Sequence, residues 1–134
     1  MSGGSRKNRT PITGVPYARM LGVEVERSEN GWLVVLPFRE ANVGNARLPA
    51  LHGGVVGAFL ELTALVELTR QLHSAGTPKP INFSIDYLRS AGADDTFGRA
   101  EIIKHGRRIA NVRVSAWQSD ETKPVAAGIG NFLL

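Results

Sequence analysis

The fold is decided by residues 52–73, which read HGGVVGAFLELTALVELTRQLH. No polar side chain occurs between Gly53 and Leu60. At about 100° per residue, Glu61 shares its helix face only with small or apolar residues. These neighbours are Gly54, Gly57, Ala58, Ala64, Leu65 and Leu68. The stretch predicts one long helix from about Gly53 to His73, which Gly76-Thr77-Pro78 would end.

Glu61 is the residue of greatest chemical interest in this helix. A carboxylate on an apolar face has to be hydrogen-bonded, paired or protonated, because burying an isolated charge is costly. Such an acid is a candidate for proton transfer or nucleophilic attack. The alternative is a structural acid that binds a backbone N–H or a basic side chain. Glu67 has polar helix neighbours and is predicted to be an ordinary solvated residue.

Strand patterns surround the helix. Apolar and charged residues alternate over 23–27, and residues 32–36 are all apolar. Asn30-Gly31 lies between these two segments and predicts that they form a hairpin. After the helix, residues 81–87 alternate strictly, with Ile81, Phe83, Ile85 and Tyr87 on one face. A second hairpin is expected from 97–104 and 107–117 with a two-residue turn at 105–106, and residues 125–134 form the last strand.

The predicted fold class is α+β, with a curved and largely antiparallel sheet wrapped around one central helix. The helix is apolar nearly all round in its first half, because Val56, Phe59 and Leu62 point away from the Glu61 face, so a flat sheet would leave part of it exposed. Residues 1–16 are predicted to be a flexible lead-in and residues 17–134 a single domain.

Composition narrows the possible classes of protein. The 134 residues contain no cysteine, which excludes a disulfide framework and a thiolate nucleophile. Neither a signal peptide nor an apolar run of about 20 residues is present, so we expect a cytoplasmic protein without a membrane partner. No group of His, Asp and Glu has metal-site spacing. The net charge of +4 fits a phosphate-bearing ligand or simply a solvated surface. Nucleic acid is a weaker candidate, because no basic run exceeds two residues.

The motif Leu51-His52-Gly53-Gly54-Val55 followed by Glu61 resembles the hotdog-fold acyl-CoA thioesterases, in the PaaI-like subgroup of phenylacetate-pathway enzymes. That family has a His-Gly-Gly turn and an acid eight residues after the first glycine, which is the interval from Gly53 to Glu61. Residues 85–89 and 106–110 fall where the family has its central strand and its hairpin. The resemblance covers about residues 17–134.

The resemblance implies hydrolysis of an acyl-CoA thioester, with CoA as part of the substrate and no separate cofactor. The Gly53 N–H would bind the thioester oxygen, and helix N-termini suit this because their first N–H groups lack partners within the helix. Glu61 would act as general base or as nucleophile, and the sequence leaves both open. His52 would order the turn or take part directly, and the alternative is a histidine that only caps the helix.

Other site residues follow from the same resemblance. The family often has Asn or Gln six residues before the histidine, where this chain has Ala46. Asn45 is the predicted substitute and Asn42 the reserve, and the alternative is an ordinary turn asparagine. Gly54, Arg89, Arg107 and Arg108 are assigned to CoA binding, although for any single arginine taken alone surface solvation is the favoured explanation.

Helix geometry adds a prediction about assembly. Gly53 and Glu61 lie eight residues apart, about 12 Å along one helix, so one chain cannot readily apply both groups to one carbonyl. Two antiparallel helices would place Gly53 of one subunit opposite Glu61 of the other. We therefore expect a homodimer with two shared sites, or a tetramer built as a dimer of dimers.

Two other functions stay open at this stage. A hotdog-fold hydratase or dehydratase also acts on acyl thioesters, although its His and acid have other spacings. A non-catalytic acyl-CoA binding or regulatory module would keep the groove, but it would not need an acid on an apolar face. Aryl, short-chain and medium-chain acyl groups are all compatible with the sequence.

Overall fold

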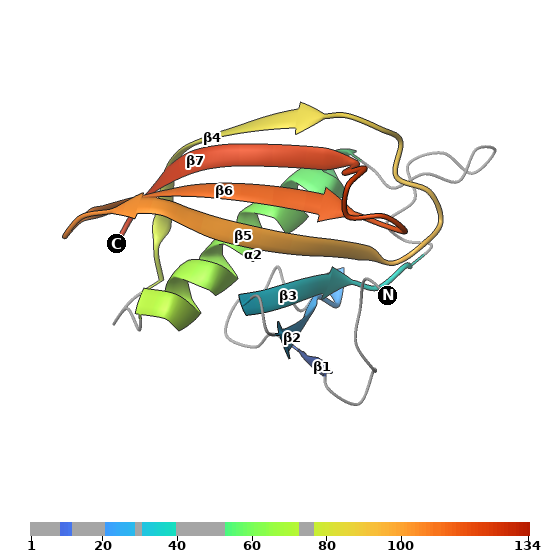
Figure 1. Ribbon diagram of the computed structural model, residues 1–134, viewed down its shortest axis with the longest axis horizontal. Helices are drawn as coiled ribbons and strands as arrows, with labels where there is room; N and C mark the ends of the chain where they lie inside the picture. Colours follow the sequence, from blue (N-terminus) through green and yellow to red (C-terminus); the bar gives the residue numbers. More distant parts are fainter. Residues whose placement is uncertain (1–8, 12–20, 29–30, 40–52, 73–76) are drawn as a thin grey trace.

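A computed structural model describes residues 9–11, 21–28, 31–39, 53–72 and 77–134. These residues form one helix and one seven-stranded antiparallel sheet (Figure 1). The elements are β1 (Arg9–Pro11), β2 (Glu24–Ser28), β3 (Gly31–Leu36), α2 (Gly53–Leu72), β4 (Lys79–Tyr87), β5 (Thr96–His105), β6 (Ile109–Trp117) and β7 (Ala126–Leu133). The strand order is β1-β2-β3-β5-β6-β7-β4. The predicted α+β class and antiparallel sheet are confirmed.

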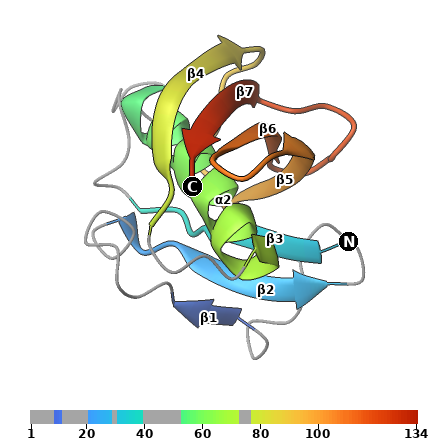
Figure 2. The same ribbon diagram turned by 90° about the vertical axis from the view of Figure 1, so that its left-hand side faces the viewer.

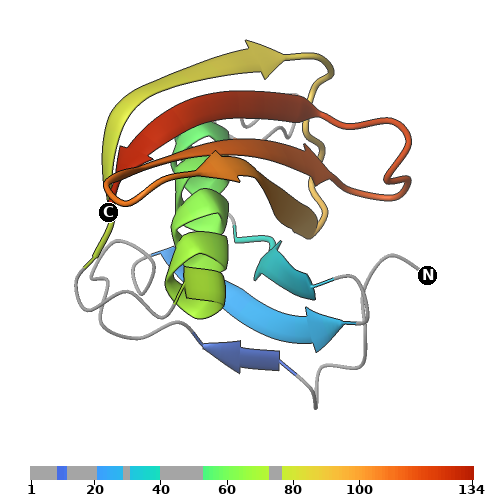
Figure 3. The same ribbon diagram turned by 60° about the vertical axis from the view of Figure 1, so that its left-hand side comes forward.

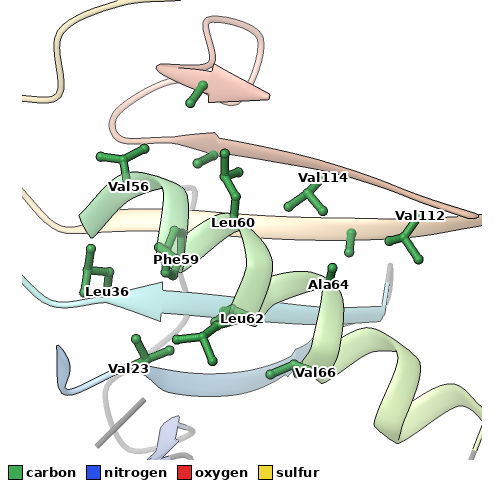
Figure 4. Packing of buried hydrophobic residues seen from close by; sticks show 14 of the residues in the cluster. Val23, Leu36, Val56, Phe59, Leu60, Leu62, Ala64, Val66, Val112 and Val114 are labelled. Carbon is green, nitrogen blue, oxygen red and sulfur yellow. The ribbon is translucent and has the colours of Figure 1, made fainter. Parts of the chain in front are cut away.

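The sheet curves around α2, as the apolar character of the helix predicted (Figures 2 and 3). Phe59, Leu60 and Leu68 are fully buried. They pack in one core with Val23, directly before β2, and with inward residues of β3 and β6, including Leu36, Val112 and Val114 (Figure 4). Burial of this apolar surface is the main favourable contribution to folding.

Gly98 on β5 sets how closely α2 approaches the sheet. A Cβ added to Gly98 would lie 2.7 Å from Thr63 Oγ1 and 2.8 Å from the Phe59 ring. Both distances are shorter than carbon side chains normally allow, so glycine is required here by packing. The side chain of Thr63 in turn donates a hydrogen bond to the Phe59 carbonyl oxygen at 2.8 Å.

Strand β4 lies at one edge of the described sheet and pairs only with β7 there. Its inward residues Phe83 and Ile85 are half-buried, whereas Ile81 and Tyr87 are largely exposed. A register shift between Pro80 and Asn82 interrupts the predicted strict alternation at Ile81. β4 is thus an edge with exposed apolar side chains, the type of edge that natural proteins usually cover.

The predicted turn at His105-Gly106 is wrong by two residues. Gly106 N–H donates to the Ile109 carbonyl oxygen at 2.8 Å, which leaves Arg107 and Arg108 as the turn between β5 and β6. An irregularity between Ile102 and Lys104 shifts the register of β5, and such a shift is not readable from alternation alone. By contrast, the β2–β3 hairpin is confirmed, and Gly31 has the positive φ of 102° that favours glycine.

Part of the predicted lead-in belongs to the sheet. Residues Arg9–Pro11 form β1, which pairs antiparallel with β2. The Arg9 side chain lies 3.6 Å from the Glu26 carboxylate, and both side chains are only 8% exposed. These three residues are therefore ordered on β2, unlike the flexible segment predicted for residues 1–16.

Candidate active site

The N-terminus of α2 opens into a groove. Gly53 is the first residue of the helix, and both Gly53 and Gly54 are exposed. The groove has a volume of about 420 Å³, and its lining includes Gly53, Val56, Tyr87, Leu88 and Arg89. N–H groups in the first turn of a helix have no partner within the helix and carry partial positive charge, so this groove can bind an oxygen atom that develops negative charge.

Nothing within the described chain requires glycine at position 53. A Cβ there would meet its nearest atom, Tyr87 Cε1, at 3.9 Å, which is an ordinary contact. Gly53 also lacks the positive φ found at Gly22 and Gly31. Among the described residues, neither packing nor backbone conformation calls for glycine, and the lack of a side chain leaves the helix start open to a molecule that approaches from outside.

Hydrogen bonds connect the groove-lining residues at the end of β4 to the start of α2 and to the residues before β7. The Tyr87 hydroxyl, at the end of β4, donates a hydrogen bond to the Gly53 carbonyl oxygen at 3.0 Å. The N–H groups of Leu88 and Arg89 both donate to the Val125 carbonyl oxygen, at 2.8 and 3.1 Å. Arg89 Nη1 donates to the Pro124 carbonyl oxygen at 2.8 Å. Tyr87 is the site residue that sequence reasoning missed, and its inward position in the alternating strand was the available signal.

Glu61 lies two turns further along α2 and is half-buried. No hydrogen bond or ion pair joins its carboxylate to any other residue that the structure describes. Ala58 and Leu65, on the same helix face, are also only half-buried, and Gly54 is exposed. This helix face, formed by Gly54, Ala58, Glu61 and Leu65, is therefore incompletely covered by the sheet of its own chain.

Of the predicted site residues, the structure brings Arg89 to Gly53 but separates Arg107 and Arg108 from it. Tyr87 pairs with Ala126, and Ala126 with Ala116, whereas the 107–108 turn follows Ala110 at the other end of β6. Six residues of strand separate Ala110 from Ala116, which corresponds to about 20 Å. Figure 1 shows the β5–β6 hairpin at the end of the sheet opposite to the start of α2. His52, Asn45 and Asn42 lie outside the described residues.

The prediction that Glu67 is an ordinary solvated residue is wrong. Its side chain is buried, with 7% exposure, and burial raises the pKa of its carboxyl above the ordinary value of 4.5. Contacts with the Gln71 side chain, the Trp32 backbone N–H and Arg99 lower the pKa but do not cancel this effect. The prediction failed because β3, distant in sequence, places Trp32 over this part of the helix, where its ring also lies 4.6 Å from the Arg70 guanidinium.

The described residues contain no group of three or more His, Cys, Asp or Glu side chains that could hold a metal ion. Among the described segments, α2 does not reach the combination of length and hydropathy that crossing a membrane requires.

Comparisons with known proteins identify the family. The profile of the acyl-CoA thioesterase N-terminal domain matches residues 44–133. The chain is 28% identical over 138 residues to the medium/long-chain acyl-CoA thioesterase YigI of Escherichia coli strain K12, covering 90% of this chain and 86% of that protein. It is also 38% identical to a protein of known structure from Chromobacterium violaceum, with a TM-score of 0.74 over 90% of this chain and 84% of the other.

A second structure supports the fold alone. The crystal structure of a Bacillus halodurans protein with CoA aligns with a TM-score of 0.79 and 22% identity, over 90% of this chain and 79% of the other. The hotdog fold expected from the resemblance is thus confirmed. The match of the profile through both Gly53 and Glu61, on this fold, shows that the chain belongs to the acyl-CoA thioesterase family.

Proposed function

We propose that the chain hydrolyses acyl-CoA to a free acid and CoA at a site that two copies share. The observation that carries this proposal is the combination of an exposed helix N-terminus at Gly53 with a half-buried carboxylate at Glu61, which has no hydrogen-bond or ion-pair partner among the described residues and lies on an incompletely covered helix face. The first group suits a developing oxyanion, and the second suits proton transfer or attack on a carbonyl carbon.

The reaction needs two bond changes at the thioester carbonyl. The Gly53 N–H donates a hydrogen bond to the carbonyl oxygen and stabilises the negative charge that develops there. In one route, Glu61 takes a proton from water, the water oxygen bonds to the carbonyl carbon, and the C–S bond then breaks to release CoA. In the other, a Glu61 oxygen itself bonds to the carbonyl carbon, CoA leaves, and water hydrolyses the resulting anhydride. His52 and Asn45 keep their predicted roles in ordering the turn and positioning water.

The shared site rests on geometry within one chain. Gly53 and Glu61 are about 12 Å apart along α2, too far for direct attack on a carbonyl held at Gly53. The incompletely covered helix face and the exposed edge of β4 offer a surface for a second copy. Two antiparallel copies of α2 would place Glu61 of one opposite Gly53 of the other.

The same arrangement also accounts for the distant arginines. The 107–108 turn lies toward the C-terminal end of α2 (Figure 1). When two copies run antiparallel, the C-terminal end of one helix lies toward the N-terminal end of the other, so the arginine turn of one copy approaches the groove of its partner. Arg89 from one copy and Arg107 and Arg108 from the other would then meet the phosphates of CoA.

We further propose medium- and long-chain acyl-CoA as the substrate class. The Escherichia coli relative carries that specificity in its name, and the Bacillus halodurans structure contains CoA on the same fold. Val56, Leu88 and Val125 give the groove apolar walls. These side chains suit an aliphatic chain more than a charged acyl group.

The direct test is release of free thiol from a panel of aryl, short-chain, medium-chain and long-chain CoA thioesters. Wild-type protein should release thiol fastest from the medium or long chains, and Glu61→Gln should lose this activity while folding normally. Consumption of substrate without thiol release would favour a hydratase. Binding without consumption would favour a regulatory module, and either result would overturn the proposal.

A further inference from the structure

Tyr87 has an unusual combination of contacts for an exposed residue. Its side chain is 58% exposed, yet its hydroxyl donates to the first carbonyl of α2, that of Gly53, at 3.0 Å. The hydrogen bond joins the end of β4 to a helix start 34 residues earlier in the chain. Burial of the ring does not explain this placement, because most of the side chain remains accessible.

The contacted carbonyl belongs to two consecutive glycines at the start of the helix. Gly53 and Gly54 have no side chain that restricts their backbone angles. The N–H groups of a first helical turn also have no partner within the helix, so the helix itself does not fix the direction of the Gly53 N–H. A contact that holds the Gly53 carbonyl restricts the backbone angles of Gly53, and the direction of its N–H depends on these angles.

We propose that Tyr87 is a positioning residue for the thioesterase reaction, whose hydroxyl fixes the Gly53 carbonyl and thereby keeps the Gly53 N–H aimed at the thioester oxygen. This inference rests on the proposed function of Gly53. Preorganised donors contribute to catalysis because they need no rearrangement as charge develops. Tyr87 itself does not touch the reacting atoms in this scheme.

Gly57, one turn further along α2, lies against the same hydroxyl group. A Cβ added to Gly57 would lie 3.0 Å from the Tyr87 hydroxyl oxygen and 3.1 Å from Ile85 Cδ1. Both contacts are tighter than usual, so a side chain at position 57 would displace the Tyr87 hydroxyl by a few tenths of an ångström from its place beside the Gly53 carbonyl. The position is buried in a helix interior, where alanine is otherwise preferred over glycine by about 1 kcal/mol.

The test is a double-mutant cycle on the full-length protein with Tyr87→Phe and Gly57→Ala. Tyr87→Phe removes one neutral hydrogen bond and should lower kcat by about five- to tenfold, with KM unchanged. Gly57→Ala should push the hydroxyl away from Gly53 and lower kcat in the same way. In the Tyr87→Phe background, Gly57→Ala should have little further effect, because the hydroxyl is gone and the remaining close contact, Ile85 Cδ1, is the end of a flexible side chain. Thr122→Val removes an exposed hydroxyl hydrogen bond from the connection between β6 and β7, so it is the matched control and should leave kcat unchanged.

Binding of a thioether analogue of acyl-CoA, which has no carbonyl oxygen, separates positioning from a structural role. Its affinity should be equal for wild-type, Tyr87→Phe and Gly57→Ala proteins, because the analogue does not use the Gly53 N–H. The role of Tyr87 would be overturned, and the proposed function left intact, by either of two results. One is an unchanged kcat in Tyr87→Phe, and the other is a decrease in kcat of the double variant that equals the product of the two single decreases. Absence of thiol release by the wild-type protein would instead overturn the proposed function itself.

Discussion

The shared site makes a prediction about mixed dimers that no single-chain site can meet. Glu61→Gln removes the proposed base, and Gly53→Ala adds a methyl group to the groove beside the proposed oxyanion donor. Loss of a general base lowers rates by about 10²- to 10⁴-fold. Gly53→Ala keeps the backbone N–H, but its methyl group obstructs the approach of the thioester oxygen, and blocking access to an oxyanion donor should cost about as much as losing it, about 10²- to 10³-fold. Both homodimers should therefore be nearly inactive.

A dimer that contains one chain of each variant should recover activity. One of its two sites combines the intact Gly53 of the Glu61→Gln chain with the intact Glu61 of the Gly53→Ala chain, and the other site carries both defects. Activity per dimer should be about half that of the wild type, because one of two sites in a two-fold dimer is intact. The Gly53→Ala chain should fold, since the added Cβ meets its nearest atom at 3.9 Å.

The assay uses two affinity tags on co-expressed chains, tandem purification of the mixed dimer, and release of free thiol from a medium-chain acyl-CoA. The separately purified homodimers provide the background, and a doubly tagged wild-type dimer provides the full rate. A mixed dimer no more active than its parents would refute the shared site and place both groups in one chain. Full activity in the Glu61→Gln homodimer would remove Glu61 from the mechanism altogether.

Three further predictions follow from particular residues. Because burial raises the pKa of Glu67 in the folded chain, the melting temperature should fall as pH rises from about 4.5 through the folded pKa. Glu67→Gln should abolish this fall while keeping thioesterase activity, and a fall of the same size in the variant would contradict the burial of Glu67. Reversing the charges of Arg107 and Arg108 should raise KM for CoA thioesters far more than it lowers kcat, and steady-state kinetics with an unchanged KM would discard their role in binding. Gly98→Ala should lower the free energy of unfolding by about 1–3 kcal/mol in urea titrations, because its Cβ would crowd Thr63 and Phe59; a silent substitution would show that the helix can move away from the sheet.

Much of the fold could be predicted from local patterns. The helix has glycine at its start and is apolar in its first half, and α2 begins at Gly53 as expected. The strand predicted over residues 107–117 corresponds to β6, in which Val112 and Val114 are fully buried. These features depend on residues near one another in sequence, and the periods of helix and strand report them directly.

Other features depend on how distant segments meet. The turn at Arg107 and Arg108 and the register shift in β5 depend on how two strands pair, and a pattern of alternating residues cannot report an inserted residue in advance. Alternation placed Tyr87 on the same face as Phe83 and Ile85, but its hydrogen bond to Gly53 joins residues on different elements, so local spacing could not indicate this partner. The separation of Arg107 and Arg108 from Arg89 likewise follows from strand order rather than from any motif.

Glu61 and Glu67 together show why burial by itself does not identify a catalytic acid. Helix periodicity predicted that Glu61 would be the enclosed carboxylate and Glu67 the solvated one, yet Glu67 is 7% exposed and Glu61 is half-buried. Glu67 interacts with the Gln71 side chain, the Trp32 backbone and the charge of Arg99, all in its own chain. Glu61 has no such contact among the described residues, and it lies on the helix face that its own sheet covers incompletely. An acid that is needed at a site completed by a second copy has to remain available in this way, so the lack of a partner at Glu61 argues more strongly for catalysis than deep burial would.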